Sequence, residues 1–304
     1  MNILCIKFFI GIPSHFCKIT NGCWGRKYAN PQYVLPQRFL KFFWDKLICL
    51  NLLLFLKMGN EFGLQDGNLK VIYEQEKISI FFKNSHWKYI LICNLPLCKK
   101  CSNVLETSEQ KSSMNCGFCT RVYGLDRVYA MSTFVDDYNS ANDDLSGHIY
   151  GLKKKKWWAE PLGYALAITI MKCYPELLDA DAIIPIPIHE SKLEERGFNQ
   201  SLELSLKLSD GLKVYGHKIS IEDNILQCDK YLELRNLHTI EERYEAVKGA
   251  FSVSNYVDFG RVLLVDDVFT SGATASECAK ILKENGAEKV DILVAGRHKY
   301  DPNK

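Results

Sequence analysis

The stretch Val262-Leu-Leu-Val-Asp-Asp-Val-Phe-Thr-Ser-Gly-Ala-Thr274 decides the fold of this chain. Its four apolar residues, Val262 to Val265, are typical of a short strand buried in a parallel sheet. Two carboxylates follow, Asp266 and Asp267, and then a turn of small residues from Thr270 to Thr274. The segment therefore predicts a buried strand that ends in an acidic pair and a tight turn.

The residues after this turn predict an amphipathic helix. Small and apolar side chains recur on one helical face at Ala275, Cys278, Ala279 and Leu282. Gly286, which follows Asn285, is a typical end for such a helix. The order is thus strand, turn and helix in direct succession.

The turn has the chemistry of a sugar-phosphate site. A helix N-terminus carries unpaired N–H groups and a partial positive charge, which favour a phosphate. Gly272 allows the backbone to approach phosphate oxygens, and neighbouring hydroxyls add donors. Ionised carboxylates only accept hydrogen bonds, so Asp266 and Asp267 suit ribose hydroxyls. The predicted phosphate-binding residues are Thr270, Ser271, Gly272, Ala273 and Thr274.

This order resembles the phosphoribosyl-pyrophosphate (PRPP) motif of type I phosphoribosyltransferases, in which an apolar strand and an acidic pair precede a Thr/Ser/Gly-rich loop. The alternative interpretation is an ordinary strand, turn and helix whose aspartates only cap the helix. The chain contains neither G-x-x-x-x-G-K-[ST] nor G-x-G-x-x-G, which excludes a P-loop and a dinucleotide fingerprint.

The composition is ordinary for a soluble globular protein, with 47% hydrophobic and 24% charged residues. At 304 residues the chain is long enough for one large or two smaller domains. A net charge of +2 gives no general argument for binding nucleic acid or a membrane. Any such partner needs a local patch.

Four of the twelve cysteines form two C-x-x-C pairs with fourteen residues between the pairs: Cys98, Cys101, Cys116 and Cys119. Each pair supplies two thiolates, and the four thiolates together can coordinate one zinc ion in a tetrahedral site. The pattern therefore predicts a structural zinc without an open position for catalysis. Two redox pairs or unrelated buried thiols are the alternatives. The remaining cysteines, among them Cys93 and Cys173, are predicted to be small buried hydrophobes of a reducing compartment.

The first 92 residues carry little functional signal. The segment 39–57 is rich in Leu, Phe and Ile, but its uninterrupted core, Leu47 to Leu56, falls short of the roughly 20 residues of a membrane-spanning helix. No integral membrane insertion is expected, and no secretory signal pattern is present. A peripheral amphipathic anchor is one alternative. Another is a poorly constrained extension, partly untranslated if Met58 is the true start.

A basic run, Lys153 to Lys156, is followed by Trp157 and Trp158. Four lysines beside two indoles could face a nucleic-acid backbone with stacked bases. The favoured interpretation is a solvated helix start whose aromatic side chains pack inward. An apolar, Ala-rich segment from Leu162 to Met171 then predicts a buried helix.

A second strand-loop-helix unit is predicted between Asp181 and Leu212. The apolar run up to His189 suits a strand, and the segment from Leu202 suits a helix. The loop between them then lies at the carboxyl edge of the sheet, where ligands bind in open α/β folds. Lys192 and Arg196 stand in this loop and are suited to pyrophosphate, although two such residues can also be ordinary surface.

The chain resembles the ComF family, in which a zinc ribbon is fused to a type I phosphoribosyltransferase domain and which is associated with competence and DNA uptake. Three features carry the resemblance: the four cysteines, the Ile-Pro-Ile-Pro-Ile-His…Glu-Arg-Gly-Phe-Asn-Gln segment, and the segment that ends at Thr274. The resemblance covers roughly residues 95–298. The cysteines of a reducing compartment and the lack of a secretory signal pattern lead us to expect a cytoplasmic protein.

The resemblance implies displacement of pyrophosphate from the anomeric carbon of PRPP, with Mg²⁺ offsetting charge on the departing group. Asp266 and Asp267 would hold the ribose hydroxyls, and Lys192 and Arg196 the pyrophosphate. No general base and no acceptor are identified. A second hypothesis is a non-catalytic accessory protein that binds PRPP, a nucleotide phosphate or single-stranded DNA during DNA uptake.

One family segment is only partly kept. Arg243 and the run Val247 to Phe251 match a motif of Arg, then Asn, then Gly-Ala-Phe, but Ala246 stands at the Asn position. This divergence puts acceptor binding or turnover in doubt more than it does PRPP binding.

The predicted fold is α/β: a type I phosphoribosyltransferase-like parallel sheet flanked by helices and preceded by a small four-cysteine zinc ribbon. The expected strands lie near 182–186, 262–266 and 290–294. The expected organisation is an extension of unclear structure over 1–92, a zinc ribbon over 93–124 and a phosphoribosyltransferase-like domain over 125–304. Successive parallel strands are expected to be joined by right-handed crossovers.

Overall fold

The computed structural model describes residues 69–74, 77–82, 87–117, 119, 124–134, 145–237, 239–254 and 256–298. The chain divides into two units, Met1–Gly59 and Asn60–Lys304, and all the described residues belong to the second. The predictions for the apolar segment 39–57 and for a start at Met58 lie outside the described residues. Among the described helices, none is both long and apolar enough to cross a bilayer.

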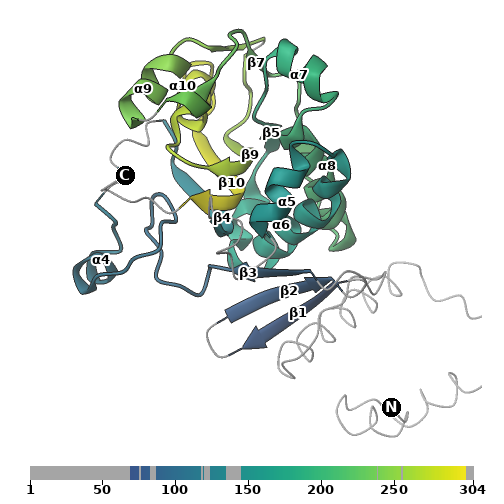
Figure 1. The fold of residues 1–304 in the computed structure, drawn as a ribbon, viewed down its shortest axis with the longest axis vertical. Helices are drawn as coiled ribbons and strands as arrows, with labels where there is room; N and C mark the ends of the chain where they lie inside the picture. The colour runs from purple at the N-terminus through teal and green to yellow at the C-terminus, as the bar shows by residue number, and fades with distance from the viewer. Residues whose placement is uncertain are drawn as a thin grey trace, which may run out of the picture. The chain divides into compact units, whose positions relative to one another are not determined.

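A five-stranded parallel sheet forms the centre of the fold (Figure 1). The strand order is β4-β10-β9-β5-β6. The strands are β4 (Arg127–Phe134), β5 (Ala182–Pro185), β6 (Ser220–Ile221), β9 (Arg261–Phe269) and β10 (Lys289–His298). The α/β prediction and its three strands are confirmed, and β4 and β6 complete the sheet.

Strand β9 is buried on both faces, as its apolar run predicts. Val262 and Leu264 belong to one hydrophobic core, whereas Leu263 and Val265 belong to the other. Alternate side chains of a strand point to opposite faces, so these four residues connect two separate cores through the sheet. The strand runs on to Phe269, so the expectation that it ends at the acidic pair is wrong.

Helices cover both faces of the sheet. One face is packed by α6 (Ala159–Cys173) and α8 (Gln200–Val214), and the other by α10 (Ala273–Glu284) (Figure 1). Shorter helices are α4 (Ser108–Ser113), α5 (Leu145–Leu152), α7 (Glu190–Arg196) and α9 (Ile240–Val247). Short 3₁₀ turns lie at η3 (Lys156–Trp158), η4 (Pro175–Asp179) and η5 (Leu234–Asn236).

Two smaller antiparallel sheets accompany the central one. The first has the order β1-β2-β3, with β1 (Leu69–Glu74), β2 (Lys77–Phe82) and β3 (Lys88–Leu91). The second pairs β7 (Leu226–Cys228) with β8 (Phe251–Val253). The first sheet lies in a region for which the sequence predicted no defined structure.

The order of connections fixes where a ligand can bind. From β5 the chain passes through α8 to β6 on one side, and from β9 it passes through α10 to β10 on the other. Neighbouring strands β5 and β9 therefore lead into loops that diverge, which is the topological switch point of an open α/β sheet. The carboxyl ends of β5 and β9 are the expected ligand site.

Cys93 and Cys173 form a disulfide between the segment after β3 and the end of α6. The prediction that they are unpaired, small buried hydrophobes is therefore wrong for these two. The two residues are 80 positions apart, and no C-x-x-C spacing marks them in the sequence. Their pairing follows from packing of β3 and β4 beside α6.

Candidate functional site

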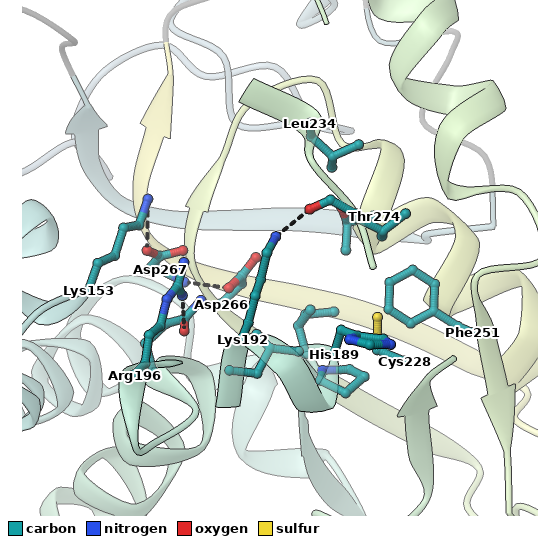
Figure 2. A pocket seen from close by; sticks show the side chains of 15 residues that line it. Lys153, His189, Lys192, Arg196, Cys228, Leu234, Phe251, Asp266, Asp267 and Thr274 are labelled. Carbon is teal, nitrogen blue, oxygen red and sulfur yellow. Dashed lines mark hydrogen bonds and ion pairs between the residues drawn. The ribbon is translucent and has the colours of Figure 1, made fainter. Parts of the chain in front are cut away.

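A cavity of about 190 Å³ opens at the carboxyl ends of β5 and β9 (Figure 2). Its wall combines the acidic pair with cations and with apolar side chains. Labelled residues of this wall include Asp266, Asp267, Lys153, Lys192, Arg196 and Thr274. Two further cavities adjoin it, of about 530 Å³ and 670 Å³, and they share several of these residues. We call the three together the carboxyl-edge site.

The two aspartates of the acidic pair lie within β9, and their side chains have different partners. Asp266 accepts hydrogen bonds from Ser201 Oγ at 2.7 Å and from the Asp267 backbone N–H at 2.9 Å. Burial, followed by the neighbouring Asp267 carboxylate, raises the pKa of Asp266 to about 8. Asp267 is 5% exposed and its Oδ2 lies 3.4 Å from Lys153 Nζ. The pair thus presents hydrogen-bond acceptors in a place where charge is costly.

The phosphate loop forms a tight turn at the start of α10. Gly272 is the N-cap of this helix and has a φ of +83°, the left-handed region that favours glycine. A Cβ there would stand 2.4 Å from the Phe269 ring, so glycine is required on two counts. Ser271 Oγ accepts from the Ala273 N–H at 3.3 Å.

The predicted loop residues differ in their access to the carboxyl-edge site. Thr274 lines the 190 Å³ cavity, and Thr270 lines the 670 Å³ cavity. Ala273 is 1% exposed and contributes backbone only. The structure therefore brings the two threonines to the cavities, whereas Ser271 and Gly272 shape the turn between them.

The two predicted cations both come from α7. His189 caps this helix, because its ring nitrogen accepts from the Ser191 N–H at 3.2 Å. Lys192 Nζ donates to the Leu232 carbonyl, and Arg196 Nη1 donates to Gln200 Oε1 at 2.8 Å. Both cations line the 190 Å³ cavity and the 530 Å³ cavity. They face the same space as the acidic pair, as Figure 2 shows.

The four cysteines of the C-x-x-C pairs form one buried cluster: Cys98, Cys101, Cys116 and Cys119. Their sulfurs all lie within 4.8 Å of one another, and the Cys98–Cys119 and Cys101–Cys116 sulfur pairs are 3.6 Å apart. A tetrahedral zinc with bonds of about 2.3 Å places its sulfurs roughly 3.8 Å apart. The cluster can hold a structural metal such as zinc.

The charge state of the cluster also suits a cation. Hydrogen bonding with Cys101 lowers the pKa of Cys98, whereas hydrogen bonding with Cys116 raises the pKa of Cys101 and hydrogen bonding with Cys101 raises that of Cys119. Four thiolates at this spacing repel one another and are costly to bury. A bound metal would offset the repulsion between the thiolates and lower the cost of burying them.

Arg297 connects the cysteine cluster to the phosphate loop. It is 6% exposed, and its Nε donates to the Cys101 carbonyl at 3.1 Å. Its Nη1 donates to the carbonyls of Phe269 and Thr270, both at 3.2 Å. The guanidinium of Arg297 therefore connects the cysteine cluster to the first residues of the phosphate loop.

Comparisons with known proteins agree with these features. No family model matches the chain. Competence protein F of Haemophilus influenzae is 32% identical over 130 residues, which cover 42% of this chain and 55% of that protein. DNA utilization protein YhgH of Escherichia coli K12 is 30% identical over 112 residues, which cover 37% of this chain and 47% of that protein. The resemblance to the ComF family is confirmed.

The chain spans about half the length of the curated proteins it matches. Among solved structures, purine phosphoribosyltransferase from Pyrococcus horikoshii covers 55% of this chain and 88% of its own, with 16% identity and a TM-score of 0.27. Hypoxanthine phosphoribosyltransferase from Staphylococcus aureus covers 48% and 69%, with 13% identity and a TM-score of 0.27.

The divergent segment, Arg243 to Phe251, begins on α9 and ends at the start of β8. Ala246 is exposed on this helix and lines none of the three cavities. Arg243 lines the 670 Å³ cavity together with Thr270, and its Nε donates to the Leu237 carbonyl at 3.1 Å. Phe251 lines the 190 Å³ cavity. The kept parts of the segment reach the carboxyl-edge site.

The residues of the run Lys153 to Trp158 differ in how they are packed in the structure. Trp158 stacks on Trp157 with ring centroids 3.9 Å apart, and on His148 at 4.0 Å. The ring centroid of Trp87 lies 4.8 Å from that of Trp158. Trp157 is 50% exposed. The expectation of inward packing therefore fits Trp158 but is wrong for Trp157, and the run enters a 3₁₀ turn at η3.

Among the polar residues that sequence reasoning missed are Lys153, which lines the cavities, and Ser201, which donates to Asp266. Lys153 is the first of four identical lysines, so its role is hidden by its neighbours, although its place directly after Leu152 sets it at the end of α5. Ser201 follows the Asn199 cap of α8, which places its hydroxyl at the sheet edge. A polar residue two positions after a helix cap is the available signal for it.

Proposed function

We propose that this protein binds PRPP, or a related ribose phosphate, at the carboxyl-edge site and transfers phosphoribosyl to an acceptor with release of pyrophosphate. One observation carries the proposal. An acidic pair, a cation-lined cavity and a glycine-capped phosphate loop converge at the switch point between β5 and β9. Each part matches one part of the ligand: hydroxyls, pyrophosphate and 5-phosphate.

In this proposal each residue has one task. Asp266 and Asp267 accept hydrogen bonds from the ribose hydroxyls, and the loop from Thr270 to Thr274 donates to the 5-phosphate. Lys192 and Arg196 bind the pyrophosphate and stabilise its charge as the bond to the anomeric carbon breaks. Mg²⁺, held together with the ligand, would supply further charge compensation. The acceptor forms the new bond at the same carbon.

The cysteine cluster has a structural role in this proposal. Zinc would be saturated by four thiolates and would fix the segment that Arg297 connects to the phosphate loop. The four thiols of the cluster must be reduced to bind a metal, which favours the cytoplasm as the place of action, although the Cys93–Cys173 disulfide is of a kind typical of oxidising compartments.

The test is a thermal-shift titration with Mg²⁺ and PRPP, followed by a pyrophosphate-release assay over a panel of bases and amines. The wild-type protein should be stabilised and should release pyrophosphate with an acceptor. The double variant Asp266→Asn with Asp267→Asn should lose both responses. Asp223→Asn with Asp258→Asn is the matched control, since both carboxylates are exposed and line none of the three cavities. Stabilisation by PRPP without pyrophosphate release for any acceptor of the panel would support ligand binding but not transfer.

A second function has its own observation. Trp157 is half-exposed and stacked on Trp158, and it stands next to the exposed lysines 154–156. Aromatic faces beside cations bind single-stranded nucleic acid through base stacking and phosphate contacts. The relatives named for competence and DNA utilization make single-stranded DNA, or the DNA-uptake machinery, the partner to test.

This second proposal predicts salt-dependent binding of single-stranded DNA. Trp157→Ala should weaken binding by about tenfold, because one base–aromatic stack contributes roughly 1–3 kcal/mol. Changing Lys154, Lys155 and Lys156 to Gln should reduce the salt dependence. Absence of binding at low salt would remove this function and leave the PRPP proposal untouched.

A further inference from the structure

We propose that Lys153 is an exchangeable cation: it pairs with Asp267 before the ligand arrives, and it moves to the pyrophosphate when ribose hydroxyls take over Asp267. This inference rests on the proposed function and assigns a role in it to a residue outside the two predicted ligand-binding segments, 181–212 and 262–274. Lys153 would then select ligands that carry a diphosphate over those that carry a single phosphate.

The position of Lys153 makes this exchange possible. Its side chain extends from the end of α5 and is 25% exposed, and it lines each of the three cavities of the carboxyl-edge site. The 530 Å³ cavity also contains Lys192 and Arg196. A short movement of one flexible side chain therefore takes its ammonium from the carboxylate to the predicted pyrophosphate site.

Asp267 is buried but is not saturated by its partner. The side chain is 7% exposed, and its Oδ1 accepts from the Val268 N–H at 2.9 Å. Its Oδ2 accepts no hydrogen bond within the part of the chain that the structure describes, and only the ion pair with Lys153 compensates it. A buried acceptor of this kind is costly unless it receives a donor, and ligand hydroxyls can supply one.

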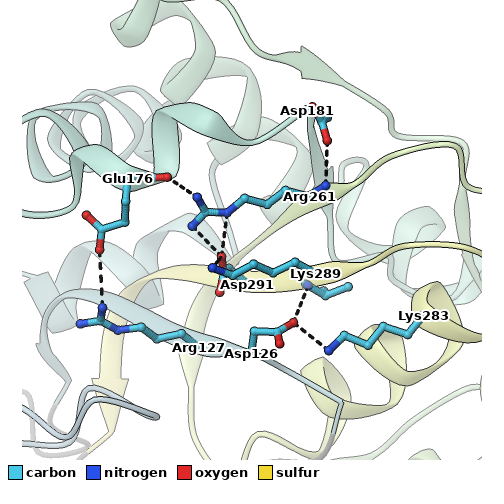
Figure 3. A network of polar contacts seen from close by, with 9 residues as sticks. Asp126, Arg127, Glu176, Asp181, Arg261, Lys283, Lys289 and Asp291 are labelled. Carbon is cyan, nitrogen blue, oxygen red and sulfur yellow. Dashed lines mark hydrogen bonds and ion pairs between the residues drawn. The ribbon is translucent and has the colours of Figure 1, made fainter.

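A second buried carboxylate in the same sheet shows what a fixed ion pair looks like (Figure 3). Asp291 on β10 accepts from Arg261 Nε at 3.0 Å and from Arg261 Nη2 at 2.8 Å. Arg261 also donates to the Glu176 carbonyl, so its planar head is held from two sides. Lys153 instead approaches Asp267 at 3.4 Å with a point charge on a flexible stem. The first pair suits permanent structure and the second suits exchange.

The charges also favour the exchange. Lys153 compensates the charge of Asp267, with which it forms the ion pair. Once ribose hydroxyls donate to the carboxylates, the ammonium is better placed on the oxygens of a diphosphate, beside Lys192 and Arg196. A ligand with only a 5-phosphate gains less from Lys153, because it leaves the 530 Å³ cavity unused.

The experiment compares three ligands in the presence of Mg²⁺: PRPP, inorganic pyrophosphate and ribose 5-phosphate. Binding is measured by isothermal titration to wild-type protein and to Lys153→Gln. The substitution should weaken PRPP and pyrophosphate by at least tenfold and ribose 5-phosphate by less than threefold. Lys153→Arg keeps the charge and should retain most of the PRPP affinity. Lys218→Gln is the matched control, since Lys218 is exposed and lines none of the cavities.

The outcomes distinguish a failure of the proposed role of Lys153 from a failure of the proposed PRPP binding. Equal losses for all three ligands, or unchanged PRPP affinity in Lys153→Gln, would overturn the role of Lys153 while PRPP binding by the wild type stands. Failure of the wild type to bind PRPP and ribose 5-phosphate would overturn both. If Lys153→Gln fails to fold, the decision passes to Lys153→Arg: loss of its preference for PRPP over ribose 5-phosphate would refute a role based on charge.

Discussion

Replacement of Asp266 by Asn should stabilise the protein, and increasingly so as the pH rises. Burial and the Asp267 carboxylate raise the pKa of Asp266 to about 8, from an ordinary value of 3.8. Between these two values the folded protein keeps a proton that the unfolded chain has lost. Unfolding then releases a proton, so rising pH lowers the contribution of Asp266 to the free energy of unfolding. Asn does not titrate and is free of this effect.

The magnitude follows from the pKa difference. Each unit corresponds to about 1.4 kcal/mol, so the stability gained by Asp266→Asn over wild type should grow by up to about 4 kcal/mol between pH 5 and pH 8. Below about pH 4 both states hold the proton and the gain should vanish. The Asn carbonyl oxygen can still accept from Ser201 Oγ and from the Asp267 N–H, so the packing is kept.

Urea denaturation of both proteins at pH 5, 6, 7 and 8 measures this difference, and titrations common to both proteins cancel in it. We expect the free energy of unfolding of Asp266→Asn to exceed that of the wild type by an amount that grows as the pH rises. A gap that stays flat, or a variant that loses stability as the pH rises, would refute the assignment of a raised pKa to Asp266. A destabilised variant at every pH would mean that the carboxylate is instead well compensated by its neighbours.

Three further predictions concern the frame of the site. Gly272→Ala should cost about 1–2 kcal/mol in urea denaturation and weaken phosphate ligands, because a side chain at φ +83° would meet the Phe269 ring; unchanged affinity would contradict this. Asp291→Asn should cost about 3 kcal/mol by removing the charge that compensates the partly buried Arg261, and a loss under 1 kcal/mol would contradict it. Chelation of a metal held by the cysteine cluster should lower the unfolding temperature and weaken ribose 5-phosphate binding, because Arg297 connects the cluster to the phosphate loop; equal affinity in metal-free protein would exclude this link.

The sequence predicted the centre of the fold because that part obeys simple rules. A continuous apolar run such as Val262 to Val265 is typical of a strand buried on both faces, and small residues with a glycine are typical of a phosphate turn. The extension of β9 to Phe269 was missed, because the two aspartates break the apolar run. In the fold, backbone pairing with β10 carries the strand past them.

The rest of the site depends on contacts between residues that are distant in sequence. Lys153 and Asp267 meet only because α5 ends above the carboxyl edge of β9, and nothing in a run of four lysines marks the one that turns inward. The disulfide between Cys93 and Cys173 likewise needs tertiary packing to bring its two ends together. The four-cysteine cluster was predictable, because its spacing alone encodes a closed site. The proposed boundaries at residues 92 and 124 stay predictions.

The most direct test of the central claim is a crystal structure of the protein with Mg²⁺ and PRPP. The account predicts the ribose hydroxyls within hydrogen-bond distance of Asp266 and Asp267, and the 5-phosphate at the start of α10 between Thr270 and Thr274. The pyrophosphate should lie among Lys153, Lys192 and Arg196. A sugar phosphate bound away from the carboxyl ends of β5 and β9, or no bound ligand at saturating concentration, would contradict it.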